Sequence, residues 1–276
     1  MHFPAVEPRK SLYYNYQVFP HYHGAAPETA DDQTVTVVGA GPIGMTAALL
    51  LAKQGVKVIL MSAELQLSEG SRALVYTKRS MEILQAAGAA GRIMAKALPW
   101  THGNSIYKGQ IAFRMASPTS EHDQFAPLNN LQQNWLEHFL LEEIQQQPNI
   151  EMRWGNKVVD HEQAYDQVTL TIETPEGAYQ HTSKWVVAAD GGRSPIRERM
   201  KLRMEGASYE GRFVIADIRI KLDYPTERLA YFSPDWNPGN TILMHREPDS
   251  IWRFDYQLDP AVTPEEALLP ENLHKA

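Results

Sequence analysis

The sequence predicts an α/β fold that combines a parallel sheet with a separate antiparallel sheet, and three observations lead to that class. Residues 34–61 show strand, helix and strand patterns joined by a glycine-rich turn, and such a βαβ unit gives parallel strands with a right-handed crossover. Residues 185–192 repeat the passage from an apolar strand into a glycine turn. Residues 213–258 hold four strand patterns separated by turn residues, as expected for an antiparallel sheet.

Bulk properties limit the protein class. The 276 residues suffice for one large domain or two modest ones, and 43% of them are hydrophobic. Lys and Arg number 26 against 33 Asp and Glu, and the net charge of −7 argues against nucleic acid or an anionic membrane as the main partner. The absence of cysteine excludes disulfides and thiolate catalysis. With no signal peptide and no apolar run long enough for a bilayer, we expect a cytoplasmic protein with no membrane partner.

Residues 1–33 are expected to form an extended N-terminal arm. Six aromatic residues are interspersed there with prolines, a composition that favours an extended chain packed on a body and disfavours a helix. His21 and His23 flank Tyr22 in this arm. Two histidines could ligate a metal, but in a proline-rich arm they are more often surface residues, so we expect no metal site.

The first βαβ unit carries a nucleotide-binding glycine pattern. Thr34–Val38 alternates as a buried strand, glycines follow at 39, 41 and 44, and an Ala/Leu-rich helix continues to Lys53. In this context the first glycine allows a tight turn, the second lets the backbone approach a pyrophosphate, and the third lets the helix pack on the strand. The helix N-terminus then offers free N–H groups to phosphates. The alternative is a glycine-rich turn that binds no ligand.

The second strand, Val56–Met61, ends without the usual ribose-binding carboxylate. Such units place an acidic residue near this strand end to bond the ribose hydroxyls. Here that position is Ser62, and the nearest carboxylate is Glu64. A serine lacks the charge-assisted hydrogen bond, so we expect weaker ribose binding. No arginine follows the strand to recognise the 2′-phosphate of NADP at this site.

The remaining elements are predicted from periodicity and turn residues. Helices are expected at 77–85 with Thr77 as N-cap, at 89–97, and at 131–147 with Asn130 as N-cap. Pro195 fits the first turn of a further helix, and residues 264–276 begin another helical pattern. Strands are expected at 106–107, 110–114, 150–154, 157–160, 167–173, 179–181, 185–190, 213–222, 229–233, 240–246 and 251–258.

Several motifs occur together in one known family. These are Gly39–Gly44, Ser71-Arg72-Ala73 followed by residues 78–84, Asp190-Gly191, and Gln133 four residues before Glu137. With them the chain resembles, from about residue 30 onward, the FAD-dependent aromatic hydroxylases, which are single-component flavoprotein monooxygenases related to para-hydroxybenzoate and hydroxyphenylpropionate hydroxylases. The Asp-Gly motif is the most specific of the four, because many nucleotide-binding proteins carry the glycine loop alone.

The resemblance implies a Rossmann-like FAD-binding domain with a parallel sheet, at 34–98 and 129–205, and an incomplete antiparallel-sheet substrate domain at 99–128 and 206–276. It implies FAD contacts from Gly39, Gly41, Pro42, Ile43, Gly44, Ser62, Glu64, Arg72, Gln133, Asp190 and Gly191. Each polar member has an ordinary alternative: Arg72 as a surface residue, Gln133 or Asp190 as a helix cap. The cations at 193–203 could meet the phosphates of NAD(P)H, although a solvated helix is the stronger expectation for them.

The family activity implies an FAD-dependent monooxygenase. NADH or NADPH reduces FAD, O2 adds at flavin C4a, and the resulting hydroperoxide hydroxylates a phenolic or other aromatic ring. The substrate is expected between the flavin and the antiparallel sheet at 213–258. His245, Arg253 and Tyr256 are candidate catalytic residues there, although for each of them packing in the sheet is the stronger expectation. The sequence does not identify which face of the sheet they share.

One family motif is absent. A Gly-Asp pair that contributes half of the flavin cradle does not occur in this sequence. We therefore expect exposed apolar surface, weak FAD binding and no hydroxylation by this chain alone. The chain would then be a fragment, a truncated product, or one half of a split enzyme completed by a C-terminal half chain or a homo-oligomer. The alternatives are a catalytically inactive FAD-monooxygenase-like remnant or interaction subunit, and an NAD-dependent dehydrogenase. Asp190-Gly191 and the missing carboxylate at 62 speak against the dehydrogenase.

Overall fold

The computed structural model describes residues 1–23, 28–29, 31–70, 72–207, 209, 211–235, 237–258, 261–269 and 271. The chain divides into two compact units, and each is described by itself. The first unit comprises residues 1–72, 83–93 and 133–205, and the second comprises 73–82, 94–132 and 206–276. Compared with the predicted boundaries, residues 73–82, 94–98 and 129–132 cluster with the second unit.

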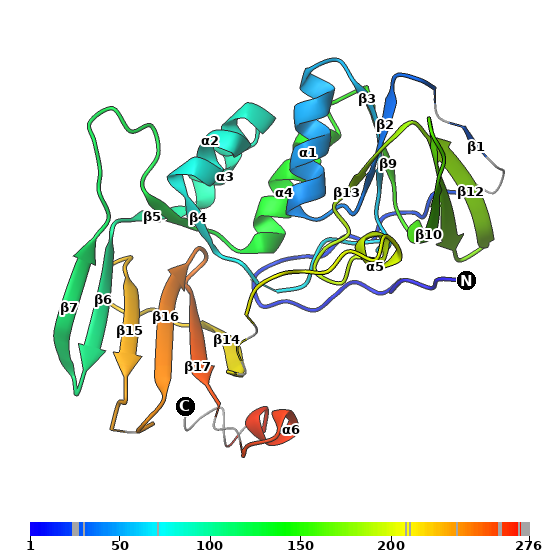
Figure 1. The fold of residues 1–276 in the computed structure, drawn as a ribbon. Helices are drawn as coiled ribbons and strands as arrows, with labels where there is room; N and C mark the ends of the chain where they lie inside the picture. The colour runs from blue at the N-terminus through cyan, green and yellow to red at the C-terminus, as the bar shows by residue number, and fades with distance from the viewer. Residues whose placement is uncertain are drawn as a thin grey trace. The chain divides into compact units, whose positions relative to one another are not determined.

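The first unit is built on a four-stranded parallel sheet. Its order is β13 (Trp185–Ala188), β2 (Thr34–Val38), β3 (Lys57–Met61) and β9 (Ile150–Arg153), and every neighbouring pair is parallel. Helices α1 (Pro42–Lys53) and α4 (Gln133–Ile144) pack on one face of this sheet (Figure 1). Both faces of this sheet are covered, and Val37 and Leu60 of its two central strands are fully buried. The predicted βαβ unit and α/β class are confirmed.

A second sheet covers the other face of the parallel sheet (Figure 1). Its order is β1 (Glu28–Thr29), β12 (Gly177–Ser183), β11 (Val168–Thr174) and β10 (Lys157–Gln163), with β12, β11 and β10 antiparallel. Ile59 and Met61 of the parallel sheet pack in one core cluster with Leu170 and Ile172 of this second sheet. The burial of these side chains accounts for the alternating apolar pattern in β11.

Capping side chains define the start of two helices. Helix α2 (Lys78–Ala87) begins after Thr77, whose hydroxyl accepts a hydrogen bond from the Ser80 amide at 3.3 Å. Helix α5 (Pro195–Arg199) is capped by Ser194, whose hydroxyl accepts from the Arg197 amide at 3.0 Å. Both helix starts agree with the sequence prediction. Helix α3 (Ala90–Lys96) also lies within its predicted range.

The second unit contains a six-stranded sheet. Its order is β14 (Phe213–Arg219), β17 (Ile251–Gln257), β16 (Thr241–Glu247), β15 (Arg228–Phe232), β6 (His102–Tyr107) and β7 (Gln110–Ala116). All neighbours are antiparallel except β15 and β6. Helix α6 (Pro264–Ala267) follows, and its Ala267 packs on Val214, Ile242 and Tyr256 of the sheet. The rest of the predicted C-terminal helical pattern, apart from residues 268, 269 and 271, lies outside the described residues.

The prediction was wrong about Asn130. It is the last residue of β8 (Leu128–Asn130), which joins β4 (Val75–Thr77) and β5 (Leu98–Trp100) in a small antiparallel sheet, and α4 starts only at Gln133. The Asn130 side chain accepts from Trp100 Nε1 at 2.6 Å and donates to the Arg246 carbonyl at 2.8 Å. It is therefore committed to tertiary bonds and cannot cap the helix. Three-residue strands are too short to show a period, so all three were missed.

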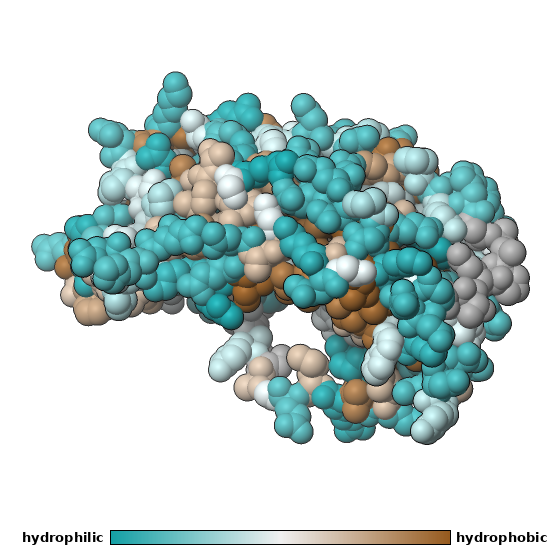
Figure 2. All heavy atoms as spheres, turned by 90° about the horizontal axis from the view of Figure 1, so that it is seen from above, coloured by the Kyte–Doolittle hydropathy of each residue, from teal (hydrophilic) through white to brown (hydrophobic). Residues whose placement is uncertain are grey.

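One face of the molecule is largely polar. The face drawn in Figure 2 is mostly hydrophilic, with hydrophobic side chains in separate small groups. Within the described residues, no helix combines the length and the apolar character that a membrane crossing requires.

Candidate functional site

A polar hollow lies at the carboxyl ends of the parallel strands in the first unit. Its volume is about 350 Å³. Chain segments that follow β2, β3 and β13 line it, as the topology of a parallel sheet predicts, because ligands of such sheets bind outside the strand ends. The lining residues are Arg9, Gly39, Ala40, Gly41, Ser62, Ala63, Glu64, Gln66, Leu67, Ser68, Arg72, Glu137, Ala189, Asp190 and Gly191.

The three predicted glycines have different structural roles. Gly39 has φ +103°, and a Cβ there would lie 2.3 Å from the Ala189 carbonyl oxygen. A Cβ at Gly44 would lie 1.8 Å from the Gly39 carbonyl oxygen. A Cβ at Gly41 would meet nothing within 4 Å. Gly39 and Gly44 are therefore required by the fold itself, whereas the backbone at Gly41 borders open space.

The start of α1 adds unpaired amides to this border. Gly41 is the N-cap residue, no side chain caps the helix there, and Pro42 occupies its first turn. The first N–H groups of a helix have no partners inside it and attract anions. Ile43 belongs to the same turn, and its side chain is 75% exposed. The helix start is therefore suited to a phosphate group.

The Glu64 carboxylate is already paired with the N-terminal arm. Arg9 Nη2 lies 3.0 Å from Glu64 Oε2, and the Arg9 amide donates to Gln66 Oε1 at 2.9 Å. The Gln66 amide in turn donates to the Glu7 carbonyl at 3.0 Å. Ser62 is buried, and its hydroxyl accepts from the Glu64 amide at 3.2 Å. The part of the hollow that follows β3 thus contains an arginine–glutamate pair beside the serine.

Arg9 was missed by the sequence analysis. It lies 55 residues before Glu64, in residues 1–23, which form no helix or strand, so no motif spacing could reveal it. The only hint was the aromatic composition of the arm, which indicated packing on the body. Tyr14 and Tyr16 are indeed buried, and Tyr16 Oη donates to the Ser68 carbonyl at 2.8 Å.

Arg72 and Asp190, two of the residues predicted to contact the cofactor, both line the hollow. Arg72 has φ +37°, and its Nε donates to the Glu69 carbonyl at 3.2 Å. Asp190 Oδ2 accepts from the Ile196 amide at 3.2 Å, so the carboxylate also caps the start of α5. Gly191 follows with φ +87°, a conformation that favours glycine. Ser71, the first residue of the predicted Ser-Arg-Ala motif, lies outside the described residues.

Gln133 does not line the hollow, but its neighbour on the helix does. Gln133 Nε2 donates to Glu137 Oε1 at 2.8 Å, and Glu137 Oε2 accepts from the Ser68 amide at 2.7 Å. Glu137 is 1% exposed and borders the hollow. The sequence analysis noted the spacing of this pair but assigned the glutamine alone to the cofactor. The structure makes Gln133 a positioning partner of Glu137.

In the second unit, strand register separates the three predicted candidates. His245 pairs with Arg253, and Arg253 pairs with Asp217, so these side chains share one face of the sheet. Tyr256 pairs with Val214 and Ile242 on the other face of the sheet, and it packs with them in an apolar cluster. Tyr256 therefore lies opposite His245 and Arg253.

The face of His245 and Arg253 also carries an apolar hollow of about 390 Å³. Phe113, Met115, Phe213 and Phe232 line it, and all four are between 43% and 62% exposed. Arg228 is its one cationic side chain, and Ser105, Thr241 and Gln257 add neutral polar groups. Exposed aromatic side chains gathered on one face mark a binding surface. None of these residues was singled out from the sequence, because their contact depends on strand order.

Two buried groups on this face titrate abnormally. Burial lowers the pKa of His245 to about 4, and the positive charges of Arg228 and Arg253 lower it further. Burial raises the pKa of Glu247 to about 8; the Asp217 carboxylate raises it too, while Arg253 opposes this. At neutral pH His245 is therefore a neutral imidazole. Within the described residues its Nδ1 atom has no hydrogen-bond partner.

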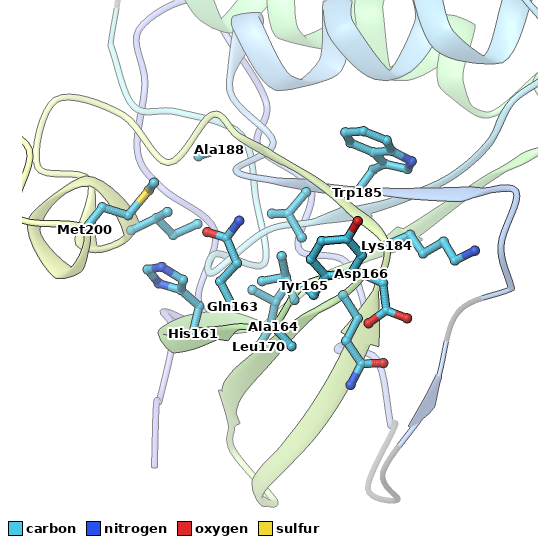
Figure 3. Close-up of a pocket in the computed structure, with 14 residues that line it drawn as sticks. His161, Gln163, Ala164, Tyr165, Asp166, Leu170, Lys184, Trp185, Ala188 and Met200 are labelled. Carbon is cyan, nitrogen blue, oxygen red and sulfur yellow. The ribbon is translucent and has the colours of Figure 1, made fainter.

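A third hollow follows the edge strand of the parallel sheet. Figure 3 shows its side chains, which include His161, Tyr165, Trp185 and Met200. Trp185 on β13 is 68% exposed and Tyr165 is fully exposed. These side chains lie beside an edge strand, where unpaired backbone groups can bind another strand. The described residues that line this hollow include no glycine loop of the kind found at the first hollow.

Known flavoproteins resemble this chain in sequence over most of its length. A family model described as "FAD binding domain" matches residues 32–263. Para-nitrophenol 4-monooxygenase of a Pseudomonas species is 28% identical over 261 residues, which cover 90% of this chain and 62% of that protein. A 3-(3-hydroxy-phenyl)propionate/3-hydroxycinnamic acid hydroxylase of Burkholderia cenocepacia is 27% identical over 242 residues, covering 87% of this chain and 44% of that protein.

Solved structures give the same picture. The crystal structure of a p-nitrophenol 4-monooxygenase from Pseudomonas putida has a TM-score of 0.80 and 26% identity, covering 90% of this chain and 63% of that one. The flavin-dependent monooxygenase PieE, solved with FAD and substrate, has a TM-score of 0.73 at 23% identity and supports the fold alone. The chain thus spans about two fifths to three fifths of the length of the curated relatives it matches.

Proposed function

We propose, from the premise that this chain belongs to the FAD binding domain family, that its first unit binds the ADP part of FAD and that the protein hydroxylates a phenolic ring. The observation that carries the proposal is the hollow at the strand ends. It combines a glycine loop, an uncapped helix start, and an arginine and an aspartate on separate loops. A generic glycine-rich turn would not need this set.

The residues present fit the ADP end of FAD. The open backbone at Gly41 and the free amides of α1 suit the pyrophosphate, with Arg72 as a countercharge. Ser62 beside the Arg9–Glu64 pair suits the ribose hydroxyls, with Glu64 as acceptor. Asp190 and Gly191 suit the ribityl side of the cofactor, and Glu137 is a further acceptor there. Arg9 and Glu137 are thus added to the residues inferred from sequence.

The aromatic hollow of the second unit is the proposed substrate surface. Phe113 and Phe232 offer flat apolar contact to a ring, and Arg228 offers a positive charge to a phenolate or another anionic substituent. His245 remains neutral, so it serves as a hydrogen-bonding group and is too weak a base to deprotonate a phenol. The two named relatives act on a nitrophenol and on a hydroxyphenyl acid, which supports an aromatic substrate with such substituents.

Bound at the glycine loop and Arg72, FAD would supply the redox chemistry by which electrons from NADH or NADPH activate O2 and one oxygen atom reaches the ring. The residues of this chain bind and orient. The glycine loop and Arg72 fix the cofactor phosphates, and the hollow at Arg228 fixes the ring. Holding two reactants close together in the correct orientation is itself a large part of catalysis.

A matched pair of arginine variants tests the cofactor site. FAD is titrated into the purified chain while the flavin fluorescence is followed. We expect weak binding, because the chain lacks the Gly-Asp motif, and a further loss of about tenfold in Arg72→Ala, equivalent to about 1.4 kcal/mol. Arg79→Ala is the control, since Arg79 lies on the surface of α2 in an ion pair with Glu82. Equal affinity in both variants would contradict the placement of FAD at this hollow.

The activity is tested separately. We expect this chain alone to show no NAD(P)H oxidation that depends on a phenol. A longer protein that contains it and a Gly-Asp motif should oxidise NADH or NADPH in response to phenols and yield a hydroxylated product, identified by mass spectrometry. Phenol-dependent oxidation by the present chain, with FAD bound in stoichiometric amount, would overturn the expectation that further sequence is needed.

A further inference from the structure

Two histidines of the N-terminal arm converge on one carboxylate from a distant hairpin. His21 Nε2 lies 3.2 Å from Glu176 Oε1, and His23 Nδ1 lies 2.8 Å from the same oxygen. The three ligand atoms lie within 4.8 Å of one another. The sequence analysis expected no metal site here because it saw only the two histidines. The third donor comes from more than 150 residues away and only the fold supplies it.

The distances from the two histidine nitrogens to the carboxylate oxygen are close to those between ligands in a metal coordination shell. With zinc–nitrogen and zinc–oxygen bonds of about 2.0–2.1 Å, two ligands at a tetrahedral angle stand about 3.3 Å apart. The His21–Glu176 distance is close to this value, and the His23–Glu176 distance is slightly shorter. Two imidazole nitrogens and one carboxylate oxygen are ligands that zinc and its late first-row neighbours prefer.

The arm is held in place on both sides of Tyr22. In an extended chain, residues two apart point the same way, so His21 and His23 face Glu176 while Tyr22 lies beneath Arg153, with the guanidinium carbon 4.3 Å from the ring centre. The Tyr22 amide donates to the Trp154 carbonyl at 2.9 Å. A Cβ at Gly155 would lie 2.9 Å from the His21 Cβ, so only glycine allows His21 to come this close.

The hairpin that carries Glu176 is equally fixed. Glu176 lies in the tight turn between β11 and β12. Thr174 Oγ1 accepts from the Glu176 amide at 3.2 Å and donates to the Gly177 carbonyl at 3.0 Å. Both sides of the cluster are therefore held by their own backbone bonds before any ion binds, which reduces the ordering cost of binding.

We propose that His21, His23 and Glu176 form a binding site for one divalent transition-metal ion of the zinc class. His23 and Glu176 are partly exposed, so the remaining coordination positions are open to water. The bound ion links the arm to the β11–β12 hairpin. This proposal depends on neither FAD binding nor hydroxylation, because none of the three residues lines the glycine-loop hollow.

Titration calorimetry with zinc chloride tests the site on the full chain, freed of any histidine tag. We expect binding of one zinc ion per chain, lost in His23→Ala and in Glu176→Gln, and no comparable binding of magnesium. Both replaced side chains are exposed enough for the fold to tolerate the change. Cobalt is the second probe, because its visible absorption bands report direct histidine and carboxylate ligation.

A second histidine–glutamate pair provides the matched control. The His122 and Glu121 side chains are both 87% exposed, and His122 Nε2 lies 3.7 Å from Glu121 Oε1. Among the described residues, no third metal-ligating side chain completes this pair. His122→Ala should bind zinc as tightly as the unaltered chain. The proposal is overturned if the unaltered chain binds no zinc, if His23→Ala and Glu176→Gln bind it equally well, or if His122→Ala loses as much binding as they do.

Discussion

The glycine-loop hollow of the first unit and the aromatic face of the second unit are built in different ways. Around the loop, polar side chains are already paired: Glu64 with Arg9, Glu137 with Gln133 and the Ser68 amide, and Asp190 with the start of α5. On the aromatic face, His245 Nδ1 is buried and has no hydrogen-bond partner in the part of the chain that the structure describes. Tyr256 Oη, on the opposite face of the same sheet, is likewise buried without a partner among the described residues.

The two regions differ in preorganisation, because the polar groups at the glycine loop are already paired before a ligand binds. A site made of backbone amides and paired side chains keeps its shape without ligand, so it can meet an invariant group such as a pyrophosphate. A sheet face with unpaired polar atoms carries a desolvation cost that a ligand can repay. The second arrangement suits a variable partner, which agrees with the proposed aromatic substrate.

The largest expected effect separates two glycines of one loop. Gly44→Ala places a Cβ 1.8 Å from a backbone oxygen, so we expect a loss of unfolding free energy of about 3 kcal/mol or more, or failure to fold. Gly41→Ala meets nothing within 4 Å, and its cost in stability should stay at about 0.5 kcal/mol. FAD binding should nevertheless weaken in Gly41→Ala. Urea unfolding and FAD titration measure both, and equal stability losses would refute the steric assignment.

A second prediction concerns buried charge on the sheet. The pKa of Glu247 is raised to about 8 from 4.5, so the folded state holds a proton that the unfolded state has lost between these values. The contribution of Glu247 to stability is thus full below pH 4.5 and is lost as pH rises to 8. The unfolding free energy of the unaltered chain should fall by about 1–3 kcal/mol between pH 5 and pH 8 because of Glu247, and this part of the fall should be absent in Glu247→Gln. Parallel stability curves against pH would contradict the assignment.

The smallest effect contrasts two buried tyrosines. Tyr179 in the first unit donates its hydroxyl to Asn156 Oδ1, and Tyr179→Phe should cost about 1 kcal/mol because a buried acceptor loses its donor. Tyr256 in the second unit has a buried hydroxyl that finds no partner among the described residues, so Tyr256→Phe should change stability by less than about 0.5 kcal/mol. Thermal unfolding of the two variants checks the pair. A larger loss of stability in Tyr256→Phe than in Tyr179→Phe would contradict the assignment of an unpaired hydroxyl to Tyr256.

Local pattern was sufficient for the first region. The glycine spacing, the alternation of Thr34–Val38 and the passage from Asp190 into a capped helix depend on residues close in sequence, so the parallel sheet and most of its loop residues could be predicted. The same logic failed at Asn130. There a good cap residue is used in tertiary hydrogen bonds to Trp100 and Arg246, which no local pattern records.

By itself, the sequence determined the α/β class, the nucleotide loop and the resemblance to flavoprotein monooxygenases, because these depend on residue type at short spacing. Only the tertiary structure decided which residues meet across long separations. It brought Arg9 to Glu64 and His23 to Glu176, and it placed Tyr256 on the opposite face from His245. Strand register and the path of an irregular arm set these contacts, and neither can be predicted from a periodic pattern of residues in the sequence.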